Sequence, residues 1–404
     1  AVKGQNWGFP TYNWQRMQQN NFEWWRRRFE QMSHYFDTFR IDHILGFFRI
    51  WSIPTDAVEG IMGVFDPALP VHVTEFGERG IWFDYDRYCK PYITDDVVAQ
   101  LFGDHADFVK ANFLLHNNRG GYDLQEAFDT QKKVEAYFSP QGDTDETQKL
   151  KQGLFDLISN IILFEHKASE GREFHFRISV ESTTSFQHLE EGTKGKLKDL
   201  YINYFYQRQD AFWKAEAMRK LPALKEATNM LICGEDLGMV PHSVPEVMKS
   251  LGILSLEIQR MPKDIHVEFF HPQNAPYLSV ITPSTHDMST IRGWWEEDRS
   301  RTEKFFYTIL QGTGFAPQTA EAWINRAIIL QHLYAPAMWS IFQIQDILGM
   351  SETLRSDNVA DERINNPANP KHYWRYRMHL PLEQLQKETE FNKELRDYII
   401  NSRR

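Results

Sequence analysis

The chain has 404 residues, 42% of them apolar and 14% aromatic, which is enough to bury a large hydrophobic core. Its formal net charge of −10 argues against nucleic-acid binding, because nucleic-acid binders carry basic surfaces. The two cysteines, Cys89 and Cys233, cannot form a disulfide framework, and the sequence contains no apolar run long enough to span a membrane. The 12 tryptophans and 29 phenylalanines mildly favour carbohydrate binding, since sugar faces stack on aromatic rings.

A short strand with a charged tip is predicted near the start of the chain. Residues 1–14 have the glycine, proline and aromatic composition of an ordered loop, and aromatic residues at helical spacing follow in residues 22–35. The next run ends in Arg40, Asp42 and His43, and the first two of these project to the same side of a strand. An arginine beside an aspartate favours the ionised carboxylate, as a nucleophile requires. The alternative is a buried structural ion pair at a strand end.

The segment from residue 69 to residue 212 is charged and amphipathic, and it is predicted to be mainly helical. It contains no metal-ligand spacing, no phosphate-binding loop and no repeat. One stretch, residues 174–180, alternates apolar and polar side chains and is the best candidate for a strand within this segment. The predicted helices are 94–102, 124–138, 145–165 and 195–220.

Two later apolar runs also end in acidic residues. Residues 230–234 lead into Glu235, and residues 277–282 lead into His286 and Asp287. Together with the aspartate of the first strand, three carboxylates then lie at the ends of three predicted strands. This set suits chemistry on a glycosidic bond, in which one carboxylate is the nucleophile, one protonates the leaving oxygen and one holds the sugar ring. Further strands are predicted at 254–259 and 337–342.

Five stretches of the chain, in the same order, resemble the motifs of the 4-alpha-glucanotransferases, the amylomaltases and disproportionating enzymes of glycoside hydrolase family 77. The similarity extends from residue 4 to about residue 385, apart from the long segment described above. One departure is that Met288 and Ser289 follow the His-Asp pair, where family members often have an acidic or amide residue. The five stretches are residues 4–12, Arg40-Ile41-Asp42-His43, Gly234-Glu235-Asp236-Leu237-Gly238, Thr285-His286-Asp287, and Glu362-Arg363-Ile364-Asn365-Asn366-Pro367 with Tyr373-Trp374-Arg375-Tyr376-Arg377.

The resemblance implies an α/β fold, a (β/α)8 TIM barrel whose catalytic residues lie at the C-terminal ends of the strands. The nucleophile strand is the fourth of that barrel, so the chain is expected to hold about the last five strands, with a large helical insert between the fourth and the fifth. An upstream segment would complete the barrel; the alternative is that strands within the insert were missed. The expected division is residues 1–68 for the barrel part with the nucleophile strand, 69–212 for the mainly helical insert, and 213–404 for the remaining strands and C-terminal helices.

The resemblance also implies a function. The family transfers glucosyl or maltooligosyl units from alpha-1,4-glucans to other glucans by a retaining double displacement. The long insert is similar to that of the plant cytosolic subgroup and its bacterial relatives, which implies maltose as donor, glycogen or starch-like acceptors and a cytoplasmic protein. The alternative is a non-catalytic glucan-binding fragment of a larger enzyme.

The site that the resemblance implies requires no cofactor and no metal ion. Glu235 must be protonated when it acts as general acid, so its surroundings are expected to raise its pKa. Retention of the anomeric configuration predicts that the carboxyl groups of Asp42 and Glu235 lie about 5–5.5 Å apart. Asp236 has an alternative role, because acidic residues after a strand often cap the next helix. The expected catalytic residues are Asp42, Glu235 and Asp287, and the expected substrate-binding residues are Arg40, His43, His286, Trp7, Tyr12 and Asp236.

Overall fold

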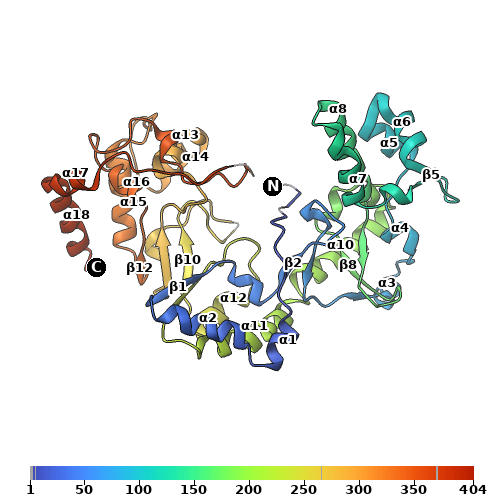
Figure 1. Ribbon diagram of the computed structural model, residues 1–404, viewed down its shortest axis with the longest axis horizontal. Coiled ribbons are helices and arrows are strands. Elements are labelled where there is room, and N and C mark those ends of the chain that lie inside the picture. The colour runs from blue at the N-terminus through green and yellow to red at the C-terminus, as the bar shows by residue number, and fades with distance from the viewer. Residues whose placement is uncertain (1–2, 5, 265, 370–371) are drawn as a thin grey trace. The chain divides into compact units, whose positions relative to one another are not determined.

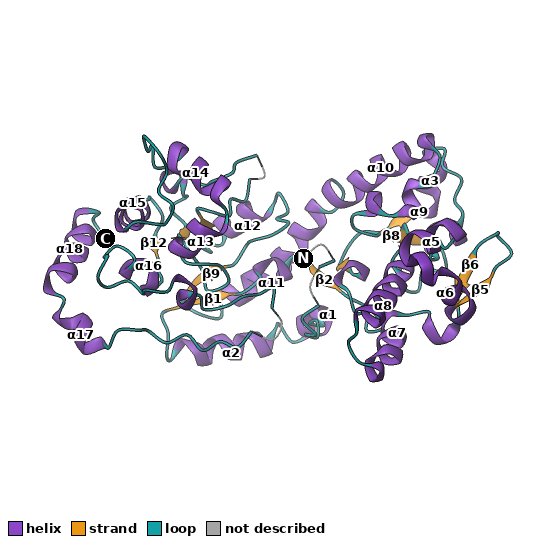
Figure 2. Cartoon of the chain, turned by 90° about the horizontal axis from the view of Figure 1, so that it is seen from above, coloured by secondary structure: helices purple, strands orange, loops and turns teal. Residues whose placement is uncertain are grey.

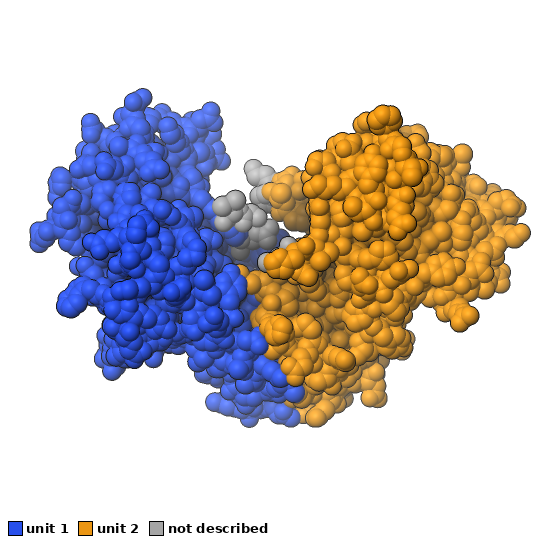
Figure 3. All heavy atoms as spheres, turned by 180° about the vertical axis from the view of Figure 1, so that it is seen from behind, with its two compact units in different colours: residues 1–21, 46–220 blue, residues 22–45, 221–404 orange. Residues whose placement is uncertain are grey.

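The computed structural model describes residues 3–4, 6–264, 266–369 and 372–404 of the chain (Figure 1). These residues form two compact units. The first unit comprises Ala1–Asn21 and Gly46–Lys220, and the second comprises Phe22–Leu45 and Leu221–Arg404 (Figure 3). The contacts therefore group residues 46–68 with the insert, whereas the three-part division expected from the sequence stays a prediction.

The second unit is built around five parallel strands that follow one another in chain order. Strand β1 pairs with β9, and β10, β11 and β12 pair in that order. A parallel bridge between Cys233 and Leu254 joins β9 to β10, and the Gly234 N–H donates to the Leu254 carbonyl at 2.8 Å. The five strands predicted at residues 36–41, 230–234, 254–259, 277–282 and 337–342 are therefore confirmed, each with shorter bounds, and the last is reduced to two residues. They are β1 Thr38–Ile41, β9 Leu231–Gly234, β10 Ser255–Ile258, β11 Ser279–Thr282 and β12 Trp339–Ser340.

Helices supply most of the crossovers that parallel strands require, as Figure 1 shows for the second unit. A core of aromatic and aliphatic side chains, among them Trp294, Trp295, Phe305 and Ile328, packs α13, α14 and α15 together. The described strands do not close into a barrel, which would need eight of them. The helices are α2 Glu23–Ser33, α12 Val244–Ser250, α13 Ile291–Glu297, α14 Arg299–Thr308, α15 Ala322–Leu333, α16 Ile344–Leu348, α17 Leu382–Lys387 and α18 Thr389–Asn401.

The first unit is mainly helical, as predicted for the insert, and Figure 2 shows its helices in purple. Its helices are α1 Trp14–Gln19, α3 Val73–Glu78, α4 Tyr85–Cys89, α5 Asp95–Phe102, α6 Ala106–Phe113, α7 Gln131–Phe138, α8 Asp145–Ile158, α9 Thr184–Gln187 and α10 Glu191–Tyr206, with α11 Asp210–Lys225 continuing into the second unit. Its described strands are short and antiparallel: β2 Ile50–Ser52 with β3 Val64–Asp66, β5 Leu114–His116 with β6 Tyr122–Leu124, and β4 Val71–His72 and β7 Leu163–Glu165 on either side of β8 Glu173–Phe176.

Within the insert, several helices and strands have bounds that differ from the predicted ones. Helix α5 begins after Thr94, whose side chain caps it by accepting from the Val97 N–H. The helix predicted for 124–138 begins only at residue 131, and the one predicted for 145–165 ends at residue 158, because the remaining residues include strands β6 and β7. The predicted strand at 174–180 exists as β8, but it pairs antiparallel with β4 and β7 and so is not a further parallel strand.

Gly234, the last residue of β9, has no room for a side chain. A Cβ atom there would lie 2.7 Å from Ile44 Cδ1 and 2.9 Å from Met248 Cε, and both neighbours are buried. We expect Gly234→Ala to lower the free energy of unfolding by about 1–3 kcal/mol through overpacking, as measured by urea denaturation. Gly195→Ala is the control, because nothing lies within 4 Å of its Cβ position in α10 and alanine favours a helix. Equal stability of Gly234→Ala and the wild type would contradict the packing described here.

Candidate active site

Asp42 and Glu235 follow two neighbouring strands at corresponding positions. Ile41 is the register partner of Gly234, so the next residues along β1 and β9 are the two acidic ones. Neighbouring strands lie about 4.8 Å apart. The Glu235 N–H donates to the Ile41 carbonyl and the Ile44 N–H donates to the Glu235 carbonyl, both at 2.9 Å. These bonds keep the two strand ends together beyond the sheet itself.

Asp42 forms an ion pair with Arg40 at the surface of the second unit. Arg40 Nη2 donates to Asp42 Oδ1 at 2.8 Å, and the Asp42 side chain is 85% exposed. The spacing of the two residues therefore brings them together as predicted, and the pair is not a buried structural one. The Asp42 carboxylate is therefore accessible from the surface and lies beside a guanidinium.

Glu235 lies in a different environment, because its side chain is only 12% exposed. Burial raises the pKa of Glu235, and this effect outweighs the opposing hydrogen bonds and the nearby Arg40 guanidinium. The His43 N–H donates to Oε2 at 2.8 Å and the Leu237 N–H donates to Oε1 at 3.0 Å. The positive φ of His43 (49°) belongs to the turn that directs its N–H toward Glu235. The pKa direction expected of a general acid is thus confirmed.

Asp287 lies on the loop that follows β11, two strands beyond β9 at the same carboxyl edge. Its side chain is about half exposed. His286 Nε2 lies 3.1 Å from Asp287 Oδ2, and Asn365 Nδ2 donates to Asp287 Oδ1 at 2.9 Å. The ring of Trp374 packs against His286 with centroids 5.3 Å apart. Sequence reasoning did not select Asn365 and Trp374 as site residues, although both lie within the C-terminal motifs.

Asp236 is placed differently from its neighbour. Its carboxylate is 1% exposed; Oδ1 accepts from the Leu256 N–H at 3.0 Å and Oδ2 accepts from Lys263 Nζ at 2.7 Å. Both oxygens are therefore used to hold the end of β9 against β10. This arrangement gives Asp236 a structural task inside the protein, and its part in substrate binding stays a prediction.

The second unit thus contains all the predicted site residues except Trp7 and Tyr12. These two aromatic residues belong to the first unit, where their side chains are 64% and 45% exposed. The Tyr12 ring packs against Trp14 with centroids 5.2 Å apart. Their part in substrate binding stays a prediction.

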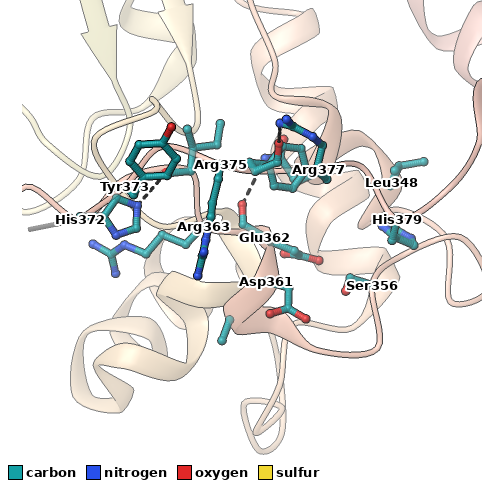
Figure 4. A pocket seen from close by; sticks show the side chains of 14 residues that line it. Leu348, Ser356, Asp361, Glu362, Arg363, His372, Tyr373, Arg375, Arg377 and His379 are labelled. Carbon is teal, nitrogen blue, oxygen red and sulfur yellow. Dashed lines mark hydrogen bonds between the residues drawn. The ribbon is translucent and has the colours of Figure 1, made fainter.

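Two cavities of the second unit lie around the segment that follows α16. One, of about 380 Å³, is lined by residues such as Glu362, Arg363, Tyr373 and Arg375 (Figure 4). The other, of about 670 Å³, lies around the start of α13. Burial raises the pKa of Glu362, which accepts from Thr290 Oγ1 at 2.9 Å and pairs with Arg292. Neither cavity is lined by the three carboxylates of the strand ends, so we locate the candidate site at the strand ends and not in these cavities.

Among the described residues, no group of three or more His, Cys, Asp or Glu side chains is arranged to hold a metal ion. No helix in the described part of the chain is both long enough and apolar enough to cross a membrane.

Comparisons of sequence identify relatives of this chain. It is 39% identical over 405 residues to the 4-alpha-glucanotransferase DPE2 of Oryza sativa subsp. japonica, an alignment that covers 99% of this chain and 43% of that protein. It is 32% identical over 180 residues to the 4-alpha-glucanotransferase of Chlamydia caviae, covering 44% of this chain and 33% of that protein. The chain therefore spans less than half the length of these relatives.

Two solved structures are also similar. The amylomaltase from Streptococcus agalactiae in complex with acarbose matches with a TM-score of 0.49 at 16% identity, over 97% of this chain and 47% of that one. The amylomaltase from Corynebacterium glutamicum matches with a TM-score of 0.47 at 10% identity, over 99% of this chain and 40% of that one. The family model described as 4-alpha-glucanotransferase matches residues 1–383. Because this match covers nearly the whole sequence, the chain belongs to the 4-alpha-glucanotransferase family, glycoside hydrolase family 77.

Proposed function

We propose that the protein is a retaining 4-alpha-glucanotransferase that moves glucosyl or maltooligosyl units between alpha-glucans. One observation carries the proposal: an exposed, arginine-paired Asp42 stands at the position corresponding to a largely buried Glu235 on the neighbouring parallel strand. Asp42 is accessible to a donor sugar, whereas burial raises the pKa of Glu235 and so favours its protonated form. An accessible carboxylate beside a carboxyl group that keeps its proton suits the roles of nucleophile and acid.

In the first half of the reaction, the Asp42 carboxylate attacks the anomeric carbon of the donor sugar. The glycosidic bond breaks as Glu235 gives its proton to the leaving oxygen, and the sugar is left esterified to Asp42. In the second half, Glu235 takes the proton from a hydroxyl group of the acceptor, whose oxygen displaces Asp42. Two inversions give net retention. When the acceptor is a glucan the outcome is transfer, and when it is water the outcome is hydrolysis.

Asp287 and His286 are proposed to hold ring hydroxyls of the sugar that reacts. Their mutual contact and the bond from Asn365 support this role, because they fix the orientation of the Asp287 carboxylate. Arg40 and His43 are proposed to contact the same sugar from the β1 side. Trp7 and Tyr12 are proposed as stacking platforms, in keeping with their exposed rings.

We also propose that the five parallel strands are the last five of a (β/α)8 barrel. The order of these strands in the sheet follows their order in the chain, which supports this proposal. Among the described strands β1 pairs only with β9, so its other edge is available for a strand from an upstream segment. The mainly helical insert between β1 and β9 supports the long-insert subgroup, for which maltose is the proposed donor and glycogen or starch-like glucans are the proposed acceptors.

The test is an assay of glucose released from maltose, with and without glycogen. Release that is increased by glycogen is expected for a transferase. Because maltose can itself accept a glucosyl unit, only glucose release that forms no longer oligosaccharide would indicate hydrolysis at the same site. Binding of glycogen with no turnover in either condition would contradict the proposal and favour a non-catalytic glucan-binding fragment.

A further inference from the structure

The loop that carries His286 and Asp287 has two buried legs and a partly exposed tip. Pro283 and Ser284 form the first leg and Ser289 and Thr290 form the second, and all four are buried. The side chains of the tip, residues 285–288, are partly or fully exposed. A loop of this kind can present its tip to a ligand while its legs are held by the interior.

Arg260, which follows β10, contacts both legs at once. It is 5% exposed. On the first leg, Nε donates to the Pro283 carbonyl at 3.0 Å and Nη2 donates to Ser284 Oγ at 2.8 Å. On the second leg, Nη2 donates to the Ser289 carbonyl at 2.7 Å and Nη1 donates to the Thr290 carbonyl at 3.4 Å.

The guanidinium of Arg260 is held by hydrogen bonds to neutral acceptors. Among the described residues Arg260 forms no salt bridge with a carboxylate, although the Asp346 and Glu297 carboxylates act on it electrostatically, and the acceptors of its guanidinium hydrogen bonds all belong to this one loop. Burial lowers the pKa of Arg260 to about 10, so the guanidinium remains charged at neutral pH. Its only described π contact is with Trp294, whose ring centroid lies 5.1 Å away.

The geometry of the guanidinium explains why an arginine is needed here. Its planar group offers N–H donors in fixed directions, so one side chain can fix the distance between the two legs of the loop. A lysine carries a single nitrogen and can reach one leg but cannot set the spacing of both. The legs in turn determine where the tip is held.

We propose that Arg260 is a positioning residue that fixes the loop so that Asp287 can hold the reacting sugar. The inference rests on the proposed function for its effect on turnover, whereas its structural part, the tethering of both legs, can be tested without any substrate. Arg260 touches no substrate itself and acts through Asp287.

The experiment compares Arg260→Lys with Arg177→Lys. Arg177 is a matched control in the first unit, since it is also buried and donates to loop carbonyls, those of Ser159 and Ile178. Hydrogen exchange of the amides in residues 284–291 is expected to rise in Arg260→Lys and to stay at the wild-type level in Arg177→Lys. Unchanged exchange in Arg260→Lys would overturn the inference, whether or not the protein turns over maltose.

The kinetic arm uses maltose and glycogen with the same variants. Arg260→Lys is expected to lower kcat by about 10–100-fold with a smaller change in KM, while Arg177→Lys keeps the wild-type kcat.

A double-mutant cycle with Asp287→Asn tests whether Arg260 acts through Asp287. The double variant should be no slower than Asp287→Asn alone, because the effects of two substitutions are not additive when one residue acts through the other. Fully multiplicative losses would overturn the inference. If Arg260→Lys fails to fold, Ser284→Ala, which removes one acceptor and keeps the cation, provides the same readouts with smaller expected changes.

Discussion

Replacing Asp42 with asparagine is expected to lower kcat for glucose release from maltose on the order of 10⁴-fold or more. The amide has the shape of the carboxylate but cannot form the glycosyl ester on which both half-reactions depend. The measurement is the initial rate of glucose release with glycogen as acceptor. Stability should change little, because Asp42 is 85% exposed, its described partner is Arg40, and exposed ion pairs contribute about 0–1 kcal/mol.

A matched aspartate is available to control this experiment. Asp123 in the first unit accepts from Arg119 Nη2 at 2.7 Å and is about half exposed, so its ion pair resembles that of Asp42. Asp123→Asn should keep the wild-type rate. If Asp42→Asn instead kept a rate within a few-fold of the wild type, Asp42 would not be the nucleophile.

The sequence alone predicted the strands of the second unit because each is a local feature. Several are runs rich in apolar residues that end at a polar or glycine residue, as with residues 230–234 before Glu235. Parallel strands share a carboxyl edge, so acidic residues that follow several such runs are expected to lie close together. The pKa direction of Glu235 was predicted from the resemblance and the chemistry it implies, whereas its cause, the burial of the side chain, became visible only in the fold.

The features that the sequence did not predict depend on contacts between distant residues. The sequence predicts residues 163–165 as the end of a helix, because they form strand β7 only by pairing with residues 174–176. Asn365 reaches Asp287 from 78 positions away. Arg260 follows the end of a strand, yet it turns into the interior to reach the loop after β11. No local pattern distinguishes these placements from exposed loops.

Replacing Glu235 with glutamine is expected to lower kcat for transfer from maltose by about 10²–10⁴-fold, the usual contribution of a general acid and base. A donor with a good leaving group separates this role from that of Asp42. With α-glucosyl fluoride, departure of the leaving group needs little protonation, so Glu235→Gln should still form the glycosyl-enzyme at a substantial rate. Asp42→Asn should lose that step with both donors. Equal losses of that step for Glu235→Gln on maltose and on the fluoride would contradict the assignment of Glu235 as the acid.

The pH dependence gives a second readout. Wild-type kcat/KM should fall on the alkaline side as Glu235 loses its proton, and because burial raises the pKa of Glu235 this fall should occur above the ordinary glutamate value of 4.5. The residual activity of Glu235→Gln should lack that fall, since an amide does not titrate. An alkaline fall that persists unchanged in the variant would assign it to another group.

Stability should follow the same titration. A carboxyl group whose folded pKa exceeds its unfolded value contributes stability that is full below the unfolded pKa and is lost as pH rises through the folded pKa. Glu235→Gln should therefore gain stability relative to the wild type as pH rises over that interval.

Glu75 gives the opposite sign, because hydrogen bonds from Arg208 and the His72 N–H lower its pKa overall, although its burial raises it. Glu75→Gln should thus lose stability relative to the wild type as pH rises from acid to neutral, and its catalytic pH profile should match the wild type because Glu75 lies outside the proposed site. Thermal unfolding across pH distinguishes the two, and parallel curves for both variants would show that Glu235 is not buried as its acid role requires.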